Sequence, residues 1–206
     1  MRSIIKTPEL PRRAVLAGVA GLALSSMVPT FAFGVTEKAA VSFIQKVVAD
    51  VHRIINTGKA EPQMLVDFEA IFRDYGEVPL IAKTVLGAPG RTASSSELSA
   101  YIRAFQGYLS RKYGRQFRDF AGAEINVVKS RDAGTKGVLV TSMVDRPNKP
   151  PFELEWWVID INNGIKMFDL KIEGISLIST ERTEIGALLE SFGGDMGKMT
   201  AHLNAN

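Results

Sequence analysis

The side chain best placed for chemistry is Asp169, because it lies inside an otherwise apolar segment, M-F-D-L-K-I. A carboxylate in an apolar pocket can act as a general base, as in small α+β isomerases. The same pattern is typical of a structural carboxylate whose oxygens accept hydrogen bonds from the protein, and this second interpretation is favoured. The pairs Asp67/Glu69 and Glu153/Glu155 have helix and strand spacings that place them on solvent-facing surfaces.

Other catalytic and metal-binding patterns are missing from the sequence. The two histidines, His52 and His202, are 150 positions apart, and neither belongs to a His-x-x-x-His spacing that would hold a metal. There is no cysteine and no G-x-S-x-G motif, so a thiol nucleophile, a disulfide framework and the usual serine-hydrolase elbow are excluded. We therefore expect no metal, no cofactor and no enzymatic activity.

The first 32 residues, called the leader segment below, have the pattern of an export signal. A basic stretch ends in Arg12 and Arg13, and fourteen mostly small and apolar residues follow at 14–27. Fourteen residues are too few for a membrane-spanning helix, which needs about 20. The R-R-A-V-L sequence resembles the bacterial twin-arginine signal, with an ordinary secretory signal as the alternative. We expect cleavage after Ala32, with cleavage after Gly34 as the alternative. The product is expected to be a soluble, single-domain chain of residues 33–206 in the periplasm.

The net charge of +3 comes from the leader segment, which holds four basic residues and one acidic residue. The rest of the chain has 21 of each, so bulk charge gives no reason to expect nucleic-acid binding. Aromatic and basic residues do alternate at 108–120, a pattern found in some nucleic-acid-binding surfaces. Because Tyr113 and Phe117 fit packing positions of a helix and the chain is exported, we expect no nucleic-acid partner.

The spacing of apolar residues divides the exported chain into a helical half and a strand half. Apolar residues recur every three or four positions up to about residue 116 and every two positions from Glu124. Helices are expected to begin after Thr36, at Pro62, near Pro79, at a Ser94-x-x-Glu97 capping box, and near Thr180. Strands are expected at 124–131, 136–145, 152–161 and 164–173. Short connections between strands imply antiparallel pairing, so we expect an α+β fold with the helices packed on one face of an antiparallel sheet of about four strands.

The two layers together supply many large apolar side chains. Periodicity does not distinguish a filled core from a cavity lined by the same residues, so both interpretations stay open. If a cavity lies between the layers, the large inward-facing residues are expected to line it. These residues are Phe68, Phe72, Ile81, Val85, Phe105, Leu109, Phe152, Leu154, Trp156 and Phe168.

Two blocks of the sequence resemble a known family. The first block reads Asp169-x-x-x-Glu173-Gly174-Ile175-Ser176-Leu177, followed by a polar stretch, an amphipathic helix, and a glycine before a short terminal helix. The second block lies upstream and consists of Leu86, Gly87, Arg91, Ser94, Phe105, Leu109, Tyr113 and Gly114. In this order the blocks are similar to the MlaC family of periplasmic phospholipid carriers, also called toluene-tolerance auxiliary components. The resemblance spans residues 38–203, and Pro89-Gly90 stands where the family often has an aromatic pair.

The resemblance implies a strongly curved antiparallel sheet around helices, as in nuclear-transport-factor-two-like and cystatin-like proteins. It also implies that phospholipid tails lie between the layers. The implied function is to carry phospholipid between an outer-membrane lipoprotein complex and an inner-membrane ABC transporter that bears a substrate-binding ring, which maintains outer-membrane lipid asymmetry. The carrier is expected to be a monomer. The alternative is a small-substrate isomerase of the same architecture with Asp169 as its base.

Overall fold

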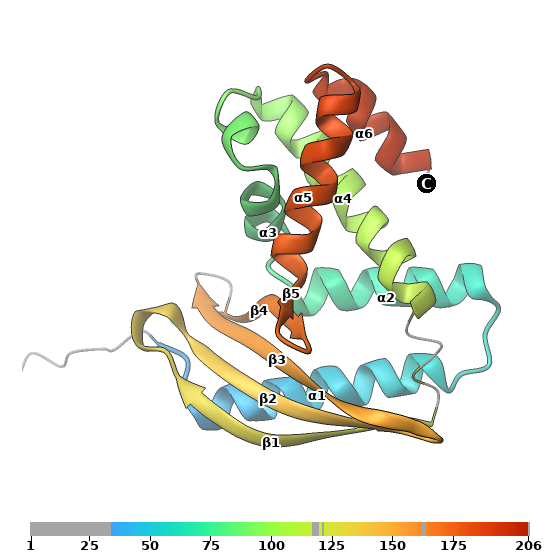
Figure 1. The fold of residues 1–206 in the computed structure, drawn as a ribbon, viewed down its shortest axis with the longest axis vertical. Helices are drawn as coiled ribbons and strands as arrows, with labels where there is room; N and C mark the ends of the chain where they lie inside the picture. Colours follow the sequence, from blue (N-terminus) through green and yellow to red (C-terminus); the bar gives the residue numbers. More distant parts are fainter. Residues whose placement is uncertain (1–33, 117–119, 121, 162–163, 206) are drawn as a thin grey trace, which may run out of the picture. The chain divides into compact units, whose positions relative to one another are not determined.

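The protein is described by a computed structural model over residues 34–116, 120, 122–161 and 164–205 (Figure 1). The leader segment lies outside the described residues. The described part contains six α-helices, which are α1 (Glu37–Ile55), α2 (Glu61–Tyr75), α3 (Val78–Leu86), α4 (Ser95–Gln116), α5 (Leu177–Ser191) and α6 (Met196–Ala205). Its five strands are β1 (Glu124–Asp132), β2 (Val138–Arg146), β3 (Lys149–Ile161), β4 (Gly164–Ile172) and β5 (Ile175–Ser176).

Capping side chains mark the starts of α1 and α4. Thr36 Oγ1 accepts a hydrogen bond from the backbone nitrogen of Ala39 at 3.2 Å, which begins α1. At the start of α4, the Glu97 nitrogen donates to Ser94 Oγ at 3.2 Å and the Ser94 nitrogen donates to Glu97 Oε2 at 2.9 Å. These reciprocal bonds form the capping box that the sequence predicted.

The sheet has the order β1-β2-β3-β4-β5, and every neighbouring pair is antiparallel. The predicted α+β fold is therefore confirmed, with a short fifth strand added. Alternation along β3 buries Phe152, Leu154 and Trp156 on the face that meets the helices. Irregular register in three of the strand pairs interrupts the ladder, and such bulges increase the twist of a sheet.

The connection from the sheet to α5 differs from the prediction. The expected strand 164–173 ends at Ile172, because Glu173 and Gly174 have φ values of 50° and 82° and turn the chain back into β5. Helix α5 then begins at Leu177, three residues before Thr180. The reason is that Ser176 caps the helix, with its Oγ accepting from the Ser179 nitrogen at 3.1 Å.

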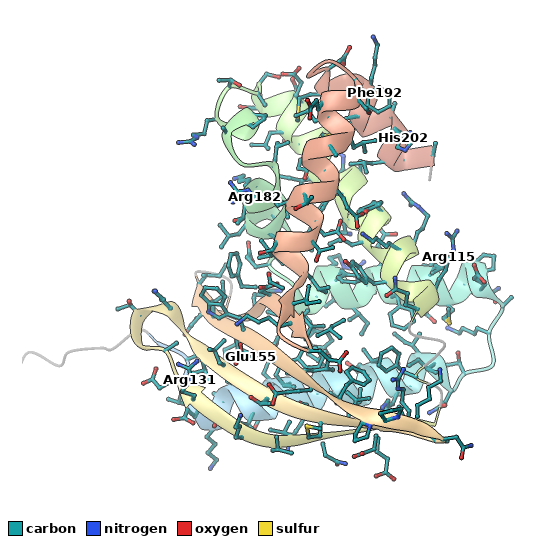
Figure 2. The ribbon with its side chains drawn as sticks, viewed as in Figure 1. Arg115, Arg131, Glu155, Arg182, Phe192 and His202 are labelled. Carbon is teal, nitrogen blue, oxygen red and sulfur yellow. The ribbon has the colours of Figure 1, made fainter. Side chains whose placement is uncertain are left out.

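The buried apolar side chains form two clusters. One lies between the inner face of the sheet and helices α1 and α2, and the other lies among α3, α4, α5 and α6. Helices α2 and α4 join the two clusters. At their crossing, a Cβ on Gly114 would lie 2.7 Å from Leu65 Cδ2, so a larger residue there would require the Leu65 side chain to move. Figure 2 shows Phe192 and His202 side by side where α6 returns along α5, with ring centroids 5.6 Å apart.

Candidate binding cavity

A cavity lies between the sheet and the helices, with about 1080 Å³ of empty space when the open solvent at its mouth is included. Sixteen of its twenty lining residues are apolar. They are Val47, Val48, Val51, Ile71, Phe72, Ile81, Phe120, Ile125, Leu154, Trp156, Met167, Phe168, Leu170, Ile172, Leu177 and Ile178. The lining therefore suits an apolar ligand.

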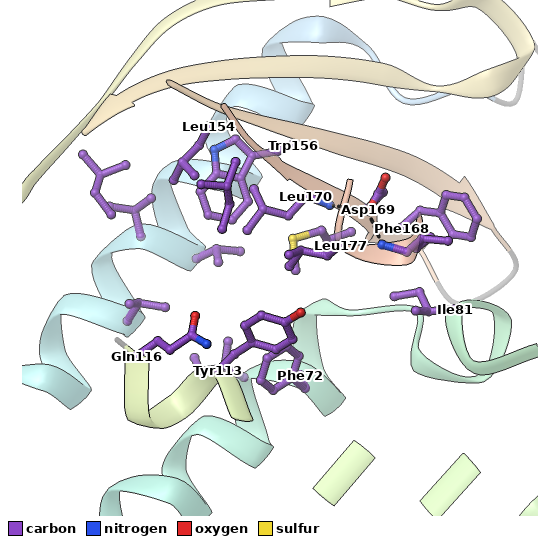
Figure 3. Close-up of a pocket in the computed structure, with 18 of the residues that line it drawn as sticks. Phe72, Ile81, Tyr113, Gln116, Leu154, Trp156, Phe168, Asp169, Leu170 and Leu177 are labelled. Carbon is purple, nitrogen blue, oxygen red and sulfur yellow. Dashed lines mark hydrogen bonds between the residues drawn. The ribbon is translucent and has the colours of Figure 1, made fainter. Parts of the chain in front are cut away.

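The wall is built from residues far apart in the sequence. In Figure 3, Leu154, Trp156 and Leu170 extend from the sheet toward Phe72 and Tyr113 on the helices below. Trp156 can present its ring to the cavity because its polar Nε1 donates to Ser142 Oγ at 3.0 Å inside the sheet.

The structure brings together five of the ten residues expected to line a cavity. Phe72, Ile81, Leu154, Trp156 and Phe168 are on the wall.

The other five expected residues are elsewhere. Phe68 and Phe152 pack in the cluster between the sheet and α1–α2, and Val85, Phe105 and Leu109 pack in the helical cluster. Val85, Phe105 and Leu109 are away from the cavity because this part of α3 and α4 buries its apolar face against other helices. Lipid contact by any of the ten stays a prediction.

Sequence reasoning did not nominate the wall contributed by α1, which consists of Val47, Val48 and Val51. These valines lie on the apolar stripe of the first helix, so the signal was present. The sequence does not show, however, which part of a stripe faces a space and which part faces packed side chains.

Asp169 lies at the cavity wall, and both of its carboxylate oxygens accept hydrogen bonds from the protein. Its Oδ1 accepts from the backbone nitrogens of Leu170 at 2.9 Å and Ile178 at 3.1 Å, and its Oδ2 accepts from Ser176 Oγ at 2.6 Å. A carboxylate at the first turn of a helix also interacts favourably with the helix dipole. Asp169 therefore joins β4 to the start of α5, which supports the structural interpretation of this residue.

A second polar group, Glu181 on α5, lies at the cavity wall with only 2 % of its surface exposed. Its Oε1 accepts hydrogen bonds from Lys112 Nζ at 2.7 Å and from the Tyr113 hydroxyl at 2.5 Å. Lys112 also donates to Glu184 at 2.6 Å and to the Tyr108 hydroxyl at 3.1 Å. This network ties α4 to α5 beside the cavity.

The network shifts the pKa values of its members. Burial, and then the hydrogen bond to Glu181, raise the pKa of Tyr113. Burial alone would lower the pKa of Lys112, but its hydrogen bonds to Glu181 and Glu184 outweigh burial and raise it. The hydrogen bond from Lys112 lowers the pKa of Glu184. At neutral pH the network therefore holds a charged Lys112, a charged Glu184 and a neutral Tyr113.

A model of the MlaC protein family matches residues 45–205, well over half of the chain. The chain belongs to the MlaC family. Among solved structures, it is similar to the phospholipid-binding protein from Ralstonia solanacearum in complex with a phospholipid, with a TM-score of 0.66 and 20 % sequence identity. The similarity covers 80 % of this chain and 94 % of that one, and it shows a shared fold.

The structure explains why the MlaC-like motif has its spacing. Asp169 and Ser176 are hydrogen-bonded across the turn formed by Glu173 and Gly174. The motif of residues 169–177 therefore connects the sheet to α5. Among the described helices, none is long and apolar enough to cross a membrane. Within the described ranges, no group of three or more histidine and acidic side chains is arranged to hold a metal ion.

Proposed function

We propose that this protein is a periplasmic phospholipid carrier that encloses acyl tails in the cavity between the sheet and the helices. The observation that carries the proposal is a cavity with sixteen apolar lining residues in a chain of the MlaC family. The phospholipid bound by the similar protein from Ralstonia solanacearum supports the same ligand class.

Exposing the acyl tails of a phospholipid to water has a large free-energy cost. Two acyl chains with about thirty methylenes in all cost roughly 24 kcal/mol to expose to water, at about 0.8 kcal/mol per methylene. A protein that moves a phospholipid through an aqueous compartment must therefore cover nearly all of the tails.

The proposed carrier moves phospholipid between the outer and the inner membrane. In this proposal the leader segment directs export and is removed, and residues 33–206 act as a monomer. The carrier exchanges lipid with an outer-membrane lipoprotein complex and with the substrate-binding ring of an inner-membrane ABC transporter, which maintains the lipid asymmetry of the outer membrane. Two features support this role. The leader segment has an export pattern, and the rest of the chain is neutral overall.

Organic extraction and mass spectrometry of the protein purified from the periplasm test the proposal. The expected result is phospholipid in a fixed ratio to protein. A protein that carries no lipid, takes up none from vesicles and instead shows a pH-dependent isomerase rate lost in Asp169→Asn would contradict it.

A further inference from the structure

An arginine, Arg146, lies between two aromatic rings, one of which belongs to the cavity wall. Arg146 is the last residue of β2, and its guanidinium carbon lies 4.7 Å from the ring centroid of Phe152 and 5.9 Å from that of Phe120. Phe120 is itself part of the cavity wall. In Figure 1 the turn between β2 and β3 lies at the same end of the fold as the last turn of α4, which contributes the wall residue Gln116.

Arg146 has no anionic partner in the described part of the chain. Arg53, Arg73 and Arg115 each pair with a carboxylate at 2.5–3.3 Å, whereas no such pair forms at Arg146. Its Nε atom is buried and has no hydrogen-bond partner. A buried donor on a cation is costly when it is left unpaired, so this position favours an anion supplied by a ligand.

A second cation near the cavity wall, Lys112, is already paired with carboxylates. Lys112 is held by Glu181 and Glu184 at 2.7 Å and 2.6 Å, and its charge is offset by two carboxylates. An anionic group brought to Lys112 would have to displace the two acidic side chains that already contact it. The electrostatic asymmetry of the cavity therefore places an anion at the Arg146 end.

We propose that the Arg146 guanidinium binds the phosphate of the phospholipid whose tails fill the cavity, an inference that rests on the proposed function. A guanidinium presents a planar set of donors that matches two phosphate oxygens, and stacking on aromatic rings fixes the orientation of that plane. The tails then extend from Phe120 along the wall toward Ile81 and Phe168. Arg146 thus gives the lipid a direction in the cavity and selects lipids that carry a phosphate.

The test compares two lipids that differ in the phosphate. Lipid-free protein, purified from cells that produce the full chain, is titrated with phosphatidylglycerol or with diacylglycerol of the same acyl chains, each in uncharged, phosphate-free detergent micelles. Arg146→Met keeps a flexible side chain against the rings and removes the charge. Arg131→Met on β1 is the matched control, since it removes the same charge from an exposed side chain outside the cavity wall.

We expect Arg146→Met to raise the dissociation constant for phosphatidylglycerol by about tenfold or more and to leave that for diacylglycerol nearly unchanged. Arg131→Met should change neither. Equal losses for both lipids, or no loss for either, would overturn the assignment of Arg146. If Arg146→Met does not fold, Arg146→Lys tests the assignment instead, because lysine keeps the charge but lacks the planar set of donors. This variant should lose affinity for phosphatidylglycerol and keep its affinity for diacylglycerol.

Two further results separate the possible ligands. A large excess of inorganic phosphate should not displace phosphatidylglycerol from the unmodified protein; displacement that disappears in Arg146→Met would show that the site takes free phosphate and would overturn the lipid assignment. An unmodified protein that binds neither lipid would contradict the proposed function itself, whereas one that binds both equally would contradict only the role of Arg146.

Discussion

Adding bulk to the cavity wall should reduce lipid loading much more than it reduces stability. Leu154 lines the cavity, whereas Leu109 packs in the helical cluster, and the two are 4 % and 6 % exposed. Leu154→Trp and Leu109→Trp are therefore the same substitution at equally buried positions, one beside a space and one inside a filled core.

The two variants have different expected magnitudes. Tryptophan adds about six heavy atoms, which at Leu154 occupy room for about five methylenes of a lipid tail, or roughly 4 kcal/mol of tail burial at about 0.8 kcal/mol each. Part of this loss is recovered if the tail shifts, so we expect loading to fall at least severalfold. Leu109→Trp overpacks a core and should lower the free energy of unfolding by about 1–3 kcal/mol.

Two measurements on each variant check this reasoning. Thermal unfolding of the lipid-free protein should show Leu154→Trp within about 1 kcal/mol of the unmodified protein, and Leu109→Trp melting several degrees lower. Mass spectrometry of extracted lipid should show a larger loss of bound lipid in Leu154→Trp than in Leu109→Trp. If Leu154→Trp loses as much stability as Leu109→Trp and keeps its lipid, the space beside Leu154 is not where the tails lie.

Three other outcomes are expected. Asp169→Asn weakens the charge-assisted hydrogen bonds at the start of α5 and should lower the free energy of unfolding by about 1–3 kcal/mol with or without lipid, as measured with denaturant; an unchanged value would show that those bonds contribute little. Burial and the hydrogen bond to Asp50 raise the pKa of Tyr75 to about 12, so its contribution to stability is complete below pH about 10 and is lost toward pH 12. Tyr75→Phe should make this alkaline decline shallower in unfolding curves, and an equally steep decline would exclude Tyr75 as a source. Amino-terminal sequencing of the periplasmic protein should find no leader segment, and replacing Arg12 and Arg13 with lysine should block twin-arginine export, whereas protein that still begins at Met1 would show that no cleavage occurs.

Local patterns were enough to predict most of the elements. The capping residues Thr36 and Ser94 marked two helix starts, and the alternation of Phe152, Leu154 and Trp156 marked a strand with one buried face. Such features depend on residues only a few positions apart, so the sequence contains them directly. The turn at Glu173 was missed because a non-glycine residue with positive φ gives little signal in the sequence.

The sequence by itself therefore determined the helical half, the antiparallel sheet, the absence of the common catalytic motifs and the resemblance to the MlaC family. Only the tertiary structure decided which apolar residues face a space. Phe72 and Phe105 both lie on apolar helix stripes, yet Phe72 lines the cavity and Phe105 is packed among helices. The physical reason is that burial of apolar surface is non-directional, so a stripe is stabilised equally well by a neighbouring helix or by a ligand. The position of Arg146 was also decided only by the tertiary structure. The sequence does not show that this side chain lies between Phe120 and Phe152.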